Sequence, residues 1–174
     1  MGTAPAILTT PIAVAAIVLG VAGVAKLRSP GGAERALAAV GLPVPRRAVR
    51  LIAAGELALA ALVLLAPDRA ASGLLAATYA LLALIAHRLT RRGAACGCFG
   101  EDDTPATDAH VWLSATIALL AGAGVAWPPH GIAWLLTGSP GAIGPLALGI
   151  AGAAYATVIA YTQLPAAWSA WRPR

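Results

Sequence analysis

The sequence predicts an all-α fold, a polytopic bundle of transmembrane helices, and three observations predict it. Hydrophobic residues make up 59% of the 174 residues and charged residues only 11%, whereas a typical soluble domain is about 25% charged. The apolar residues are gathered in long runs. These runs are rich in alanine, leucine, glycine and valine, and small residues of this kind let membrane helices pack closely.

Five apolar runs are each close to the ~20 residues that cross the hydrocarbon core of a bilayer. They cover residues 6–25, 48–66, 70–89, 109–127 and 142–164. Proline follows the second, fourth and fifth runs at Pro67, Pro128 and Pro165, as expected of a residue that cannot continue a helix. Pro11 falls within the first turns of the first run, where proline is best tolerated.

Two of the connecting segments are more than plain loops. Residues 29–47 contain several prolines and glycines, and the central stretch 33–40 predicts a short helix that lies at the membrane interface. Residues 127–144 carry His130 and Trp134. Tryptophan at this level is typical of the aromatic belt at a membrane surface, so we expect an interfacial segment there.

The positive charges predict how the helices are oriented. All but one of the 12 lysines and arginines fall in segments that share one face of the five-helix arrangement, and only Arg69 falls on the other. Positive residues favour the cytoplasmic side. We therefore expect a multi-pass protein of the cell (inner/cytoplasmic) membrane, with its N-terminus outside and its C-terminus cytoplasmic. Topology thus explains the net charge of +5, and no nucleic-acid partner is expected.

Cys96 and Cys98 are the only cysteines of the chain, and a single glycine separates them. A disulfide between such close cysteines closes a strained ring, and strained disulfides suit exchange better than permanent structure. The positive charges place the pair near the cytoplasmic face, where disulfides rarely persist. A pair at that face would therefore cycle between dithiol and disulfide.

Two other interpretations of the cysteine pair stay open at this point. The cysteines would be small buried hydrophobic residues if they only filled space. Together with His87 or His110, which are predicted near the same face, they would form a soft metal site. Zinc sites usually separate their cysteines by two to four residues, so no metal ligand is assigned. His130 is expected on the opposite face.

Glu56 is an ionisable residue about 12 Å deep in the second apolar run, at 1.5 Å per residue. Ionisable groups inside a bilayer are costly and usually face the bundle interior with a partner. Lys26, at the end of the first run, is the nearest counter-charge. A Lys26–Glu56 pair would lock two helices together, or would relay protons to the thiols or to a bound quinone-like molecule.

The order of these features resembles the MauE family of methylamine-utilisation membrane proteins, which are relatives of the DoxX-like four-helix membrane proteins. The resemblance covers about residues 5–126. It rests on Lys26, Leu27 and Pro30 at the first helix end, Glu56 in the second helix, and Cys96-Gly97-Cys98-Phe99-Gly100 after the third. It implies a four-helix MauE/DoxX-like domain over residues 1–127. An interfacial loop, a fifth C-terminal helix and a cytoplasmic tail then occupy residues 128–174.

The resemblance implies a membrane protein that supports disulfide formation or maturation of a partner redox protein, as in the maturation of methylamine dehydrogenase, alongside a thioredoxin-like partner. Cys96 and Cys98 would be the redox pair. The other matching positions are Lys26, Glu56, Phe99 and Gly100. Many family members carry an Arg-Asn pair early in the fourth helix. This chain has His110 there, so His110 takes its place or the chain serves another partner.

The leading expectation is therefore a membrane thiol–disulfide redox protein, with Cys96 and Cys98 as catalytic residues and a thioredoxin-like or other redox protein as partner. A quinone is a candidate electron acceptor. The main rival is a non-enzymatic assembly or scaffold subunit, whose function would survive replacement of both cysteines. The second rival is a Cys/His metal-handling membrane protein, which would lose its bound metal with the cysteines.

Overall fold

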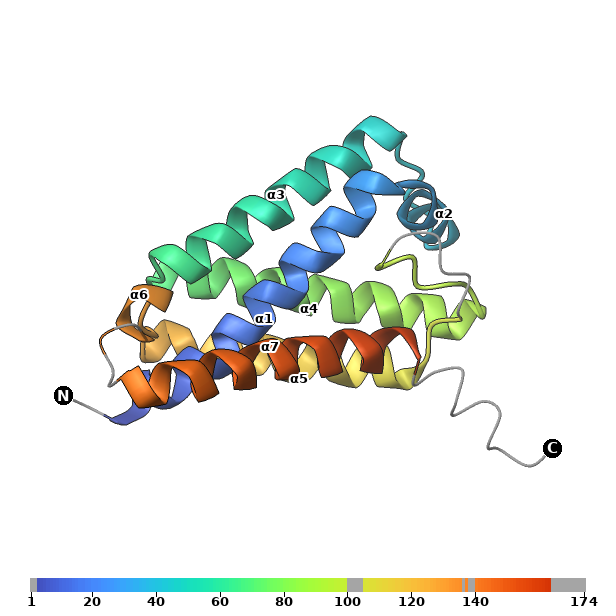
Figure 1. The fold of residues 1–174 in the computed structure, drawn as a ribbon. Coiled ribbons are helices and arrows are strands. Elements are labelled where there is room, and N and C mark those ends of the chain that lie inside the picture. The colour runs from blue at the N-terminus through green and yellow to red at the C-terminus, as the bar shows by residue number, and fades with distance from the viewer. Residues whose placement is uncertain (1–2, 100–104, 136, 138–139, 164–174) are drawn as a thin grey trace, which may run out of the picture.

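The computed structural model is a bundle of long α-helices with a short helix at each end (Figure 1). It describes residues 3–99, 105–135, 137 and 140–163. The helices are α1 (Thr3–Arg28), α2 (Gly31–Ala39), α3 (Arg46–Leu65), α4 (Arg69–Arg92), α5 (Asp108–Ala126), α6 (Ile132–Leu135) and α7 (Pro140–Thr162). Within these ranges the only β-type pairing is an isolated bridge between Ala95 and Pro105.

The prediction of an all-α transmembrane bundle is confirmed. Among the described residues, five helices are long and apolar enough to cross a membrane, namely α1, α3, α4, α5 and α7. They correspond to the five predicted runs, and the chain is a multi-pass membrane protein. The short helix predicted over 33–40 is also present, as α2, which packs its buried face of Gly31, Gly32, Ala33 and Ala36 against the bundle.

Local signals end α4 and start α5, and so define the loop that carries the cysteines. Gly93 ends α4 in the left-handed conformation, with φ of 61°, which glycine adopts without steric cost. Thr107 and His110 form a reciprocal capping box at the start of α5, and this satisfies backbone N–H groups that the first turn leaves unpaired. The described residues between these two positions, 94–99 and 105–106, are called the cysteine loop below.

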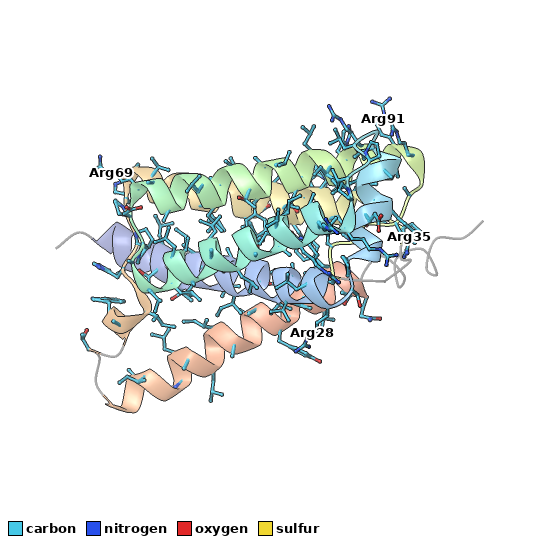
Figure 2. All side chains as sticks on the ribbon, turned by 90° about the horizontal axis from the view of Figure 1, so that it is seen from above. Arg28, Arg35, Arg69 and Arg91 are labelled. Carbon is cyan, nitrogen blue, oxygen red and sulfur yellow. The ribbon has the colours of Figure 1, made fainter. Side chains whose placement is uncertain are left out.

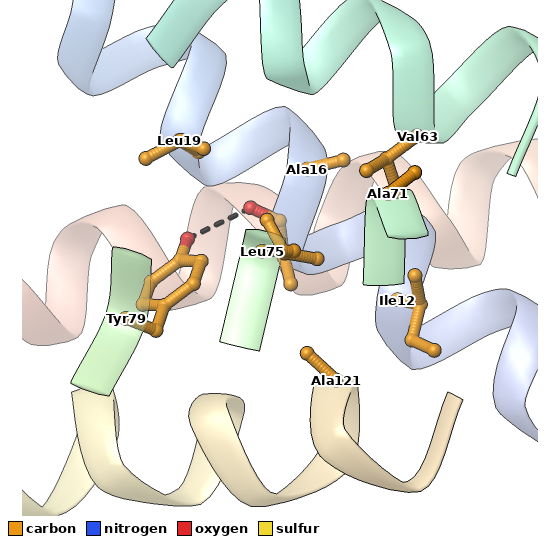
Figure 3. Packing of buried hydrophobic residues seen from close by; sticks show 9 residues of the cluster. Ile12, Ala16, Leu19, Val63, Ala71, Leu75, Tyr79 and Ala121 are labelled. Carbon is orange, nitrogen blue, oxygen red and sulfur yellow. Dashed lines mark hydrogen bonds between the residues drawn. The ribbon is translucent and has the colours of Figure 1, made fainter. Parts of the chain in front are cut away.

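The hydrophobic core lies where α1 crosses α3, α4 and α5, and Figure 3 shows its packing. Ile12 and Leu19 of α1 and Leu75 of α4 belong to one cluster of packed side chains, and all three are almost fully buried. The hydroxyl of Tyr79 donates a hydrogen bond to the carbonyl oxygen of Ala15, at 2.7 Å (Figure 3). A buried hydroxyl without a partner is costly, so this bond fixes the position of α4 along α1.

The two ends of the bundle differ in charge. Arg35 and Arg91 lie at one end, together with α2 and the cysteine loop, and Arg69 lies at the other (Figure 2). His130 is at the Arg69 end, as predicted, where its ring stacks on that of Trp134 with centroids 4.7 Å apart. Two of the positive residues used to predict the orientation, Arg172 and Arg174, lie outside the described residues. So does Pro165, which follows the fifth run.

Candidate functional site

Lys26 and Glu56 form the ion pair that the sequence predicted. The Nζ of Lys26 lies 2.6 Å and 2.8 Å from the two carboxylate oxygens of Glu56, so both oxygens accept a charge-assisted bond. Each of the two residues is only 6% exposed. The helices approach closely here because Gly23 of α1 has no side chain, and an added Cβ would lie 3.0 Å from the carbonyl oxygen of Ala53 in α3.

Gly97, between the two cysteines, seats the cysteine loop on the start of α2. Its φ is +61°, in the left-handed region that favours glycine. A Cβ at this position would lie 2.4 Å from the carbonyl oxygen of Gly32, far inside van der Waals contact. The guanidinium of Arg92 also donates to the carbonyl oxygen of Ala39 at the end of α2. The loop and α2 are therefore held together by backbone contact.

Both cysteines are free thiols; Cys96 is buried and Cys98 is half-buried. The Sγ of Cys98 lies 3.7 Å from the carbonyl oxygen of Cys96. The side-chain hydrogen bond between the thiols raises the pKa of Cys96, with burial acting in the same direction. The same bond and the positive charge of Lys26 lower the pKa of Cys98, against the effect of burial and of Glu56. Cys98 is therefore the sulfur that ionises first.

The ion pair and the thiols line one apolar cavity of about 460 Å³. Its walls come from α1, α2, α3, α4 and the cysteine loop. Most of the lining is aliphatic, and the charged lining residues are Lys26 and Glu56. Leu42, Ile52 and Leu81 line the cavity and are also about half exposed on the outer surface, so its mouth is at the lipid-facing side. We call this space the α3/α4 cavity.

A second group of side chains lies on the other side of the cysteine loop. A small cavity there is lined by both cysteines, Phe99, His110 and Tyr161. The ring centroid of Tyr161 is 5.6 Å from that of Phe99 and 5.8 Å from that of His110. The hydroxyls of Tyr161 and Ser114 are 2.9 Å apart and share a hydrogen bond. These contacts fix α7 against α5 at the level of the thiols.

His110 reaches the site but is committed to a structural bond. The backbone N–H of Thr107 donates to its Nδ1 at 3.1 Å, so in the neutral ring the proton is on Nε2. The ring also forms a hydrogen bond with the backbone of Tyr161, and it lines the small cavity. His87 is exposed on α4 and does not line either cavity. In the described part of the chain, no group of three His, Cys, Asp or Glu side chains could hold a metal ion.

The predicted site residues come together around the cysteine loop, with Lys26, Glu56, Phe99 and His110 each lining a cavity that a cysteine also lines. Gly100 lies outside the described residues. Sequence reasoning missed Tyr161, which gave no signal as one polar aromatic residue within an apolar run. It also missed the contact between Gly97 and Gly32, although adjacent glycines at 31 and 32 are a sign of close backbone approach.

Comparison with protein families adds an independent observation. The family model described as methylamine utilisation protein MauE matches residues 3–128. The chain belongs to the MauE family. It is thus a membrane protein of a family linked to methylamine utilisation, as the resemblance implied. The matched region contains α1 to α5 and the cysteine loop, whereas α7 and Tyr161 lie beyond it. No curated protein matches the chain, and no solved structure does.

Replacing Gly97 is expected to detach the cysteine loop from α2. In Gly97→Ala the added Cβ clashes with the backbone of Gly32, so the loop must move and Cys96 becomes more exposed. We expect alkylation of Cys96 in the purified, reduced protein to accelerate at least about tenfold, measured by mass spectrometry of the labelled peptides.

Gly93→Ala is the matched control for this prediction. Gly93 has the same φ of +61°, but an added Cβ would meet nothing within 4 Å. The two variants therefore share the cost of a left-handed alanine, about 1 kcal/mol, and differ only in the clash. Equal alkylation of Cys96 in both variants would show that the contact with Gly32 does not hold the loop.

Breaking the buried ion pair is expected to destabilise the bundle strongly. Glu56→Gln leaves the ammonium group of Lys26 buried without a counter-charge, which costs about 3–5 kcal/mol in the free energy of unfolding. Lys26→Met/Glu56→Met removes both charges and should recover most of this loss. The measurement is unfolding of the purified protein in mild detergent.

The exposed pair of Arg46 and Glu34 provides the matched control. Its N–O distance is 2.9 Å, but the side chain of Arg46 is 70% exposed. Because solvent screens such pairs, Glu34→Gln should cost about 0–1 kcal/mol. A similar loss for Glu34→Gln and Glu56→Gln would contradict the importance that we give to the buried pair.

Proposed function

We propose that this MauE-family protein is a membrane thiol–disulfide redox protein, in which Cys96 and Cys98 cycle between dithiol and disulfide. By family resemblance it supports disulfide formation or maturation of a partner redox protein, which would be thioredoxin-like or another thiol protein. The observation that carries this proposal is the position of the two thiols. Both line one cavity with a buried lysine and glutamate, and their pKa values are shifted in opposite directions.

Opposite shifts suit an exchange reaction, because one sulfur attacks while the other waits as a protonated thiol. The thiolate of Cys98 attacks a disulfide of the partner, which forms a mixed disulfide and releases one partner thiolate. The thiol of Cys96 loses its proton and attacks the sulfur of Cys98. This closes the Cys96–Cys98 bond and releases the second partner thiolate. The reverse sequence transfers the disulfide to a partner dithiol.

Lys26 and Glu56 support the pair in this proposal without touching the partner. The positive charge of Lys26 favours the thiolate of Cys98, and the carboxylate of Glu56 holds the ammonium group in place at 2.6 Å. Glu56 also provides an acceptor for a proton that leaves the thiols. Together they are positioning residues that tune the ionisation of the attacking sulfur.

The positive end of the bundle would be cytoplasmic, because Lys and Arg favour that side. This orientation puts the cysteine loop in the cytoplasmic half of a cell membrane. A pair there exchanges with a cytoplasmic thiol protein, or passes electrons to and from an acceptor within the bilayer. A simple oxidase that faces the outer side of the membrane does not fit this arrangement.

Trapping the thiols in intact cells tests the proposal. Cells are treated with a membrane-permeant or an impermeant maleimide, before and after reductant, and labelling of Cys96 and Cys98 is measured. We expect an oxidised fraction that reductant removes, and labelling by the permeant reagent alone. Labelling by the impermeant reagent would show that the orientation is the opposite of the one proposed. Cys96→Ser and Cys98→Ser should each abolish maturation of the partner.

Two outcomes of this experiment would reject the redox proposal. A pair that stays fully reduced under oxidant, with normal partner maturation in both Cys→Ser variants, would indicate a scaffold or assembly subunit. A reduced pair that maleimide labels only after a chelator removes a bound metal would indicate metal handling.

The pH dependence of alkylation tests the assignment of Cys98 as the attacking sulfur. A thiol reacts as its thiolate, so its alkylation rate rises with pH through its own pKa. Because the pKa of Cys98 is lowered and that of Cys96 is raised, the alkylation rate of Cys98 should reach half of its maximum at a lower pH than that of Cys96. Site-resolved alkylation of the reduced protein over a pH series measures both. Lys26→Met should move the Cys98 midpoint upward.

A further inference from the structure

The α3/α4 cavity is larger than exchange between the two sulfurs requires. Its volume of about 460 Å³ falls within the range of roughly 300–1,000 Å³ that small-molecule sites occupy. A mostly apolar wall with a few convergent polar groups is also typical of such sites. Here those groups are the ammonium and carboxylate of the ion pair and the two thiols, which all line the cavity.

The mouth of the cavity faces the region that lipid occupies. Leu42 and Ile52 lie on the α2–α3 side of the mouth, Leu81 lies on α4, and all three are exposed. A ligand that enters here comes from the bilayer and must itself be apolar. Gly55 also lines the cavity and is exposed, and a Cβ built there would meet nothing within 4 Å, so no side chain narrows the space at this point.

The polar groups of the cavity wall suit an apolar ligand that carries a ring oxygen able to accept a hydrogen bond. An ammonium group has three N–H bonds, and two of those of Lys26 point at Glu56. The third can donate to a carbonyl oxygen in the cavity. The hydroxyl of Thr78 donates instead to its own helix, to the carbonyl oxygen of Leu74 at 2.8 Å. A hydrocarbon chain alone would offer no acceptor to this third N–H bond.

We infer that the α3/α4 cavity is the binding site of a lipid-soluble quinone, which takes up the two electrons of the Cys96–Cys98 dithiol. In this reaction two S–H bonds break and one S–S bond forms. The two electrons and two protons pass to the two quinone oxygens and give the quinol. The redox half of this inference rests on the proposed function, whereas the binding half does not require that the thiols react.

The redox half is tested with decylubiquinone, whose fully substituted ring prevents a thiol from replacing a ring hydrogen. The reduced protein in lipid nanodiscs should convert one quinone to quinol per protein and end as the Cys96–Cys98 disulfide. In Gly55→Phe the new ring fills the cavity mouth, and the rate should fall at least tenfold. Gly122→Phe is the matched control, because Gly122 of α5 also has open space around it and does not line the cavity.

The binding half is tested in the Cys96→Ser/Cys98→Ser variant with a photoreactive azidoquinone. Crosslinks should map to α3 and α4. They should decrease when excess decylubiquinone is added but persist when decanol is added. They should disappear in Gly55→Phe but not in Gly122→Phe. Equal displacement by decanol would show that the cavity accepts any apolar chain, and would overturn the inference. Wild-type quinone reduction in Gly55→Phe would overturn it as well.

The outcomes separate this inference from the proposed function. If a small disulfide such as oxidised glutathione or a thioredoxin oxidises the thiols but decylubiquinone neither oxidises them nor crosslinks, the proposed function stands and the quinone site is rejected. If azidoquinone crosslinks as expected but no oxidant closes the Cys96–Cys98 bond, the binding site stands, and both the electron transfer and the proposed function are rejected.

Discussion

The buried ion pair of Lys26 and Glu56 is the constraint on which the rest of the site depends. Two charges far from water are costly unless they meet each other, and here both carboxylate oxygens lie within 2.8 Å of the ammonium nitrogen. To meet, they must bring the end of α1 against the middle of α3, and Gly23 permits this approach. The crossing of α1 and α3 therefore forms one wall of the α3/α4 cavity and sets a fixed positive charge near the thiols.

The backbone contact between Gly97 and Gly32 fixes the position of the cysteine loop relative to this wall. It seats the cysteine loop on α2, and α2 in turn closes the cavity at the positive end of the bundle. A substituent at Gly97 would push the loop away from α2. The glycine between the cysteines thus has two roles, since it allows the left-handed turn and also the close approach of two backbones. Gly97 is therefore a closely packed position.

The site is not confined to the region that defines the family. Tyr161 of α7 contacts Phe99 and His110 through its ring and Ser114 through its hydroxyl, although the family match ends at residue 128. Helix α7 therefore covers the side of the cysteine loop that faces away from the α3/α4 cavity. The thiols line only a small cavity toward α5 and α7, and a cavity of about 460 Å³ on the side of α3 and α4. A lipid-soluble reactant would use the larger cavity.

The sequence by itself determined the five spans, the short helix α2, the difference in charge between the two ends and the pairing of Lys26 with Glu56. These follow from local hydropathy and from the high cost of an isolated charge in lipid, which a single chain displays in its residue order. Only the tertiary structure decided that α3 and α4 leave a cavity between them, that Gly97 rests on Gly32 and that Tyr161 reaches the cysteine loop. Those features depend on how helices distant in sequence cross, and many different crossings bury the same apolar residues equally well.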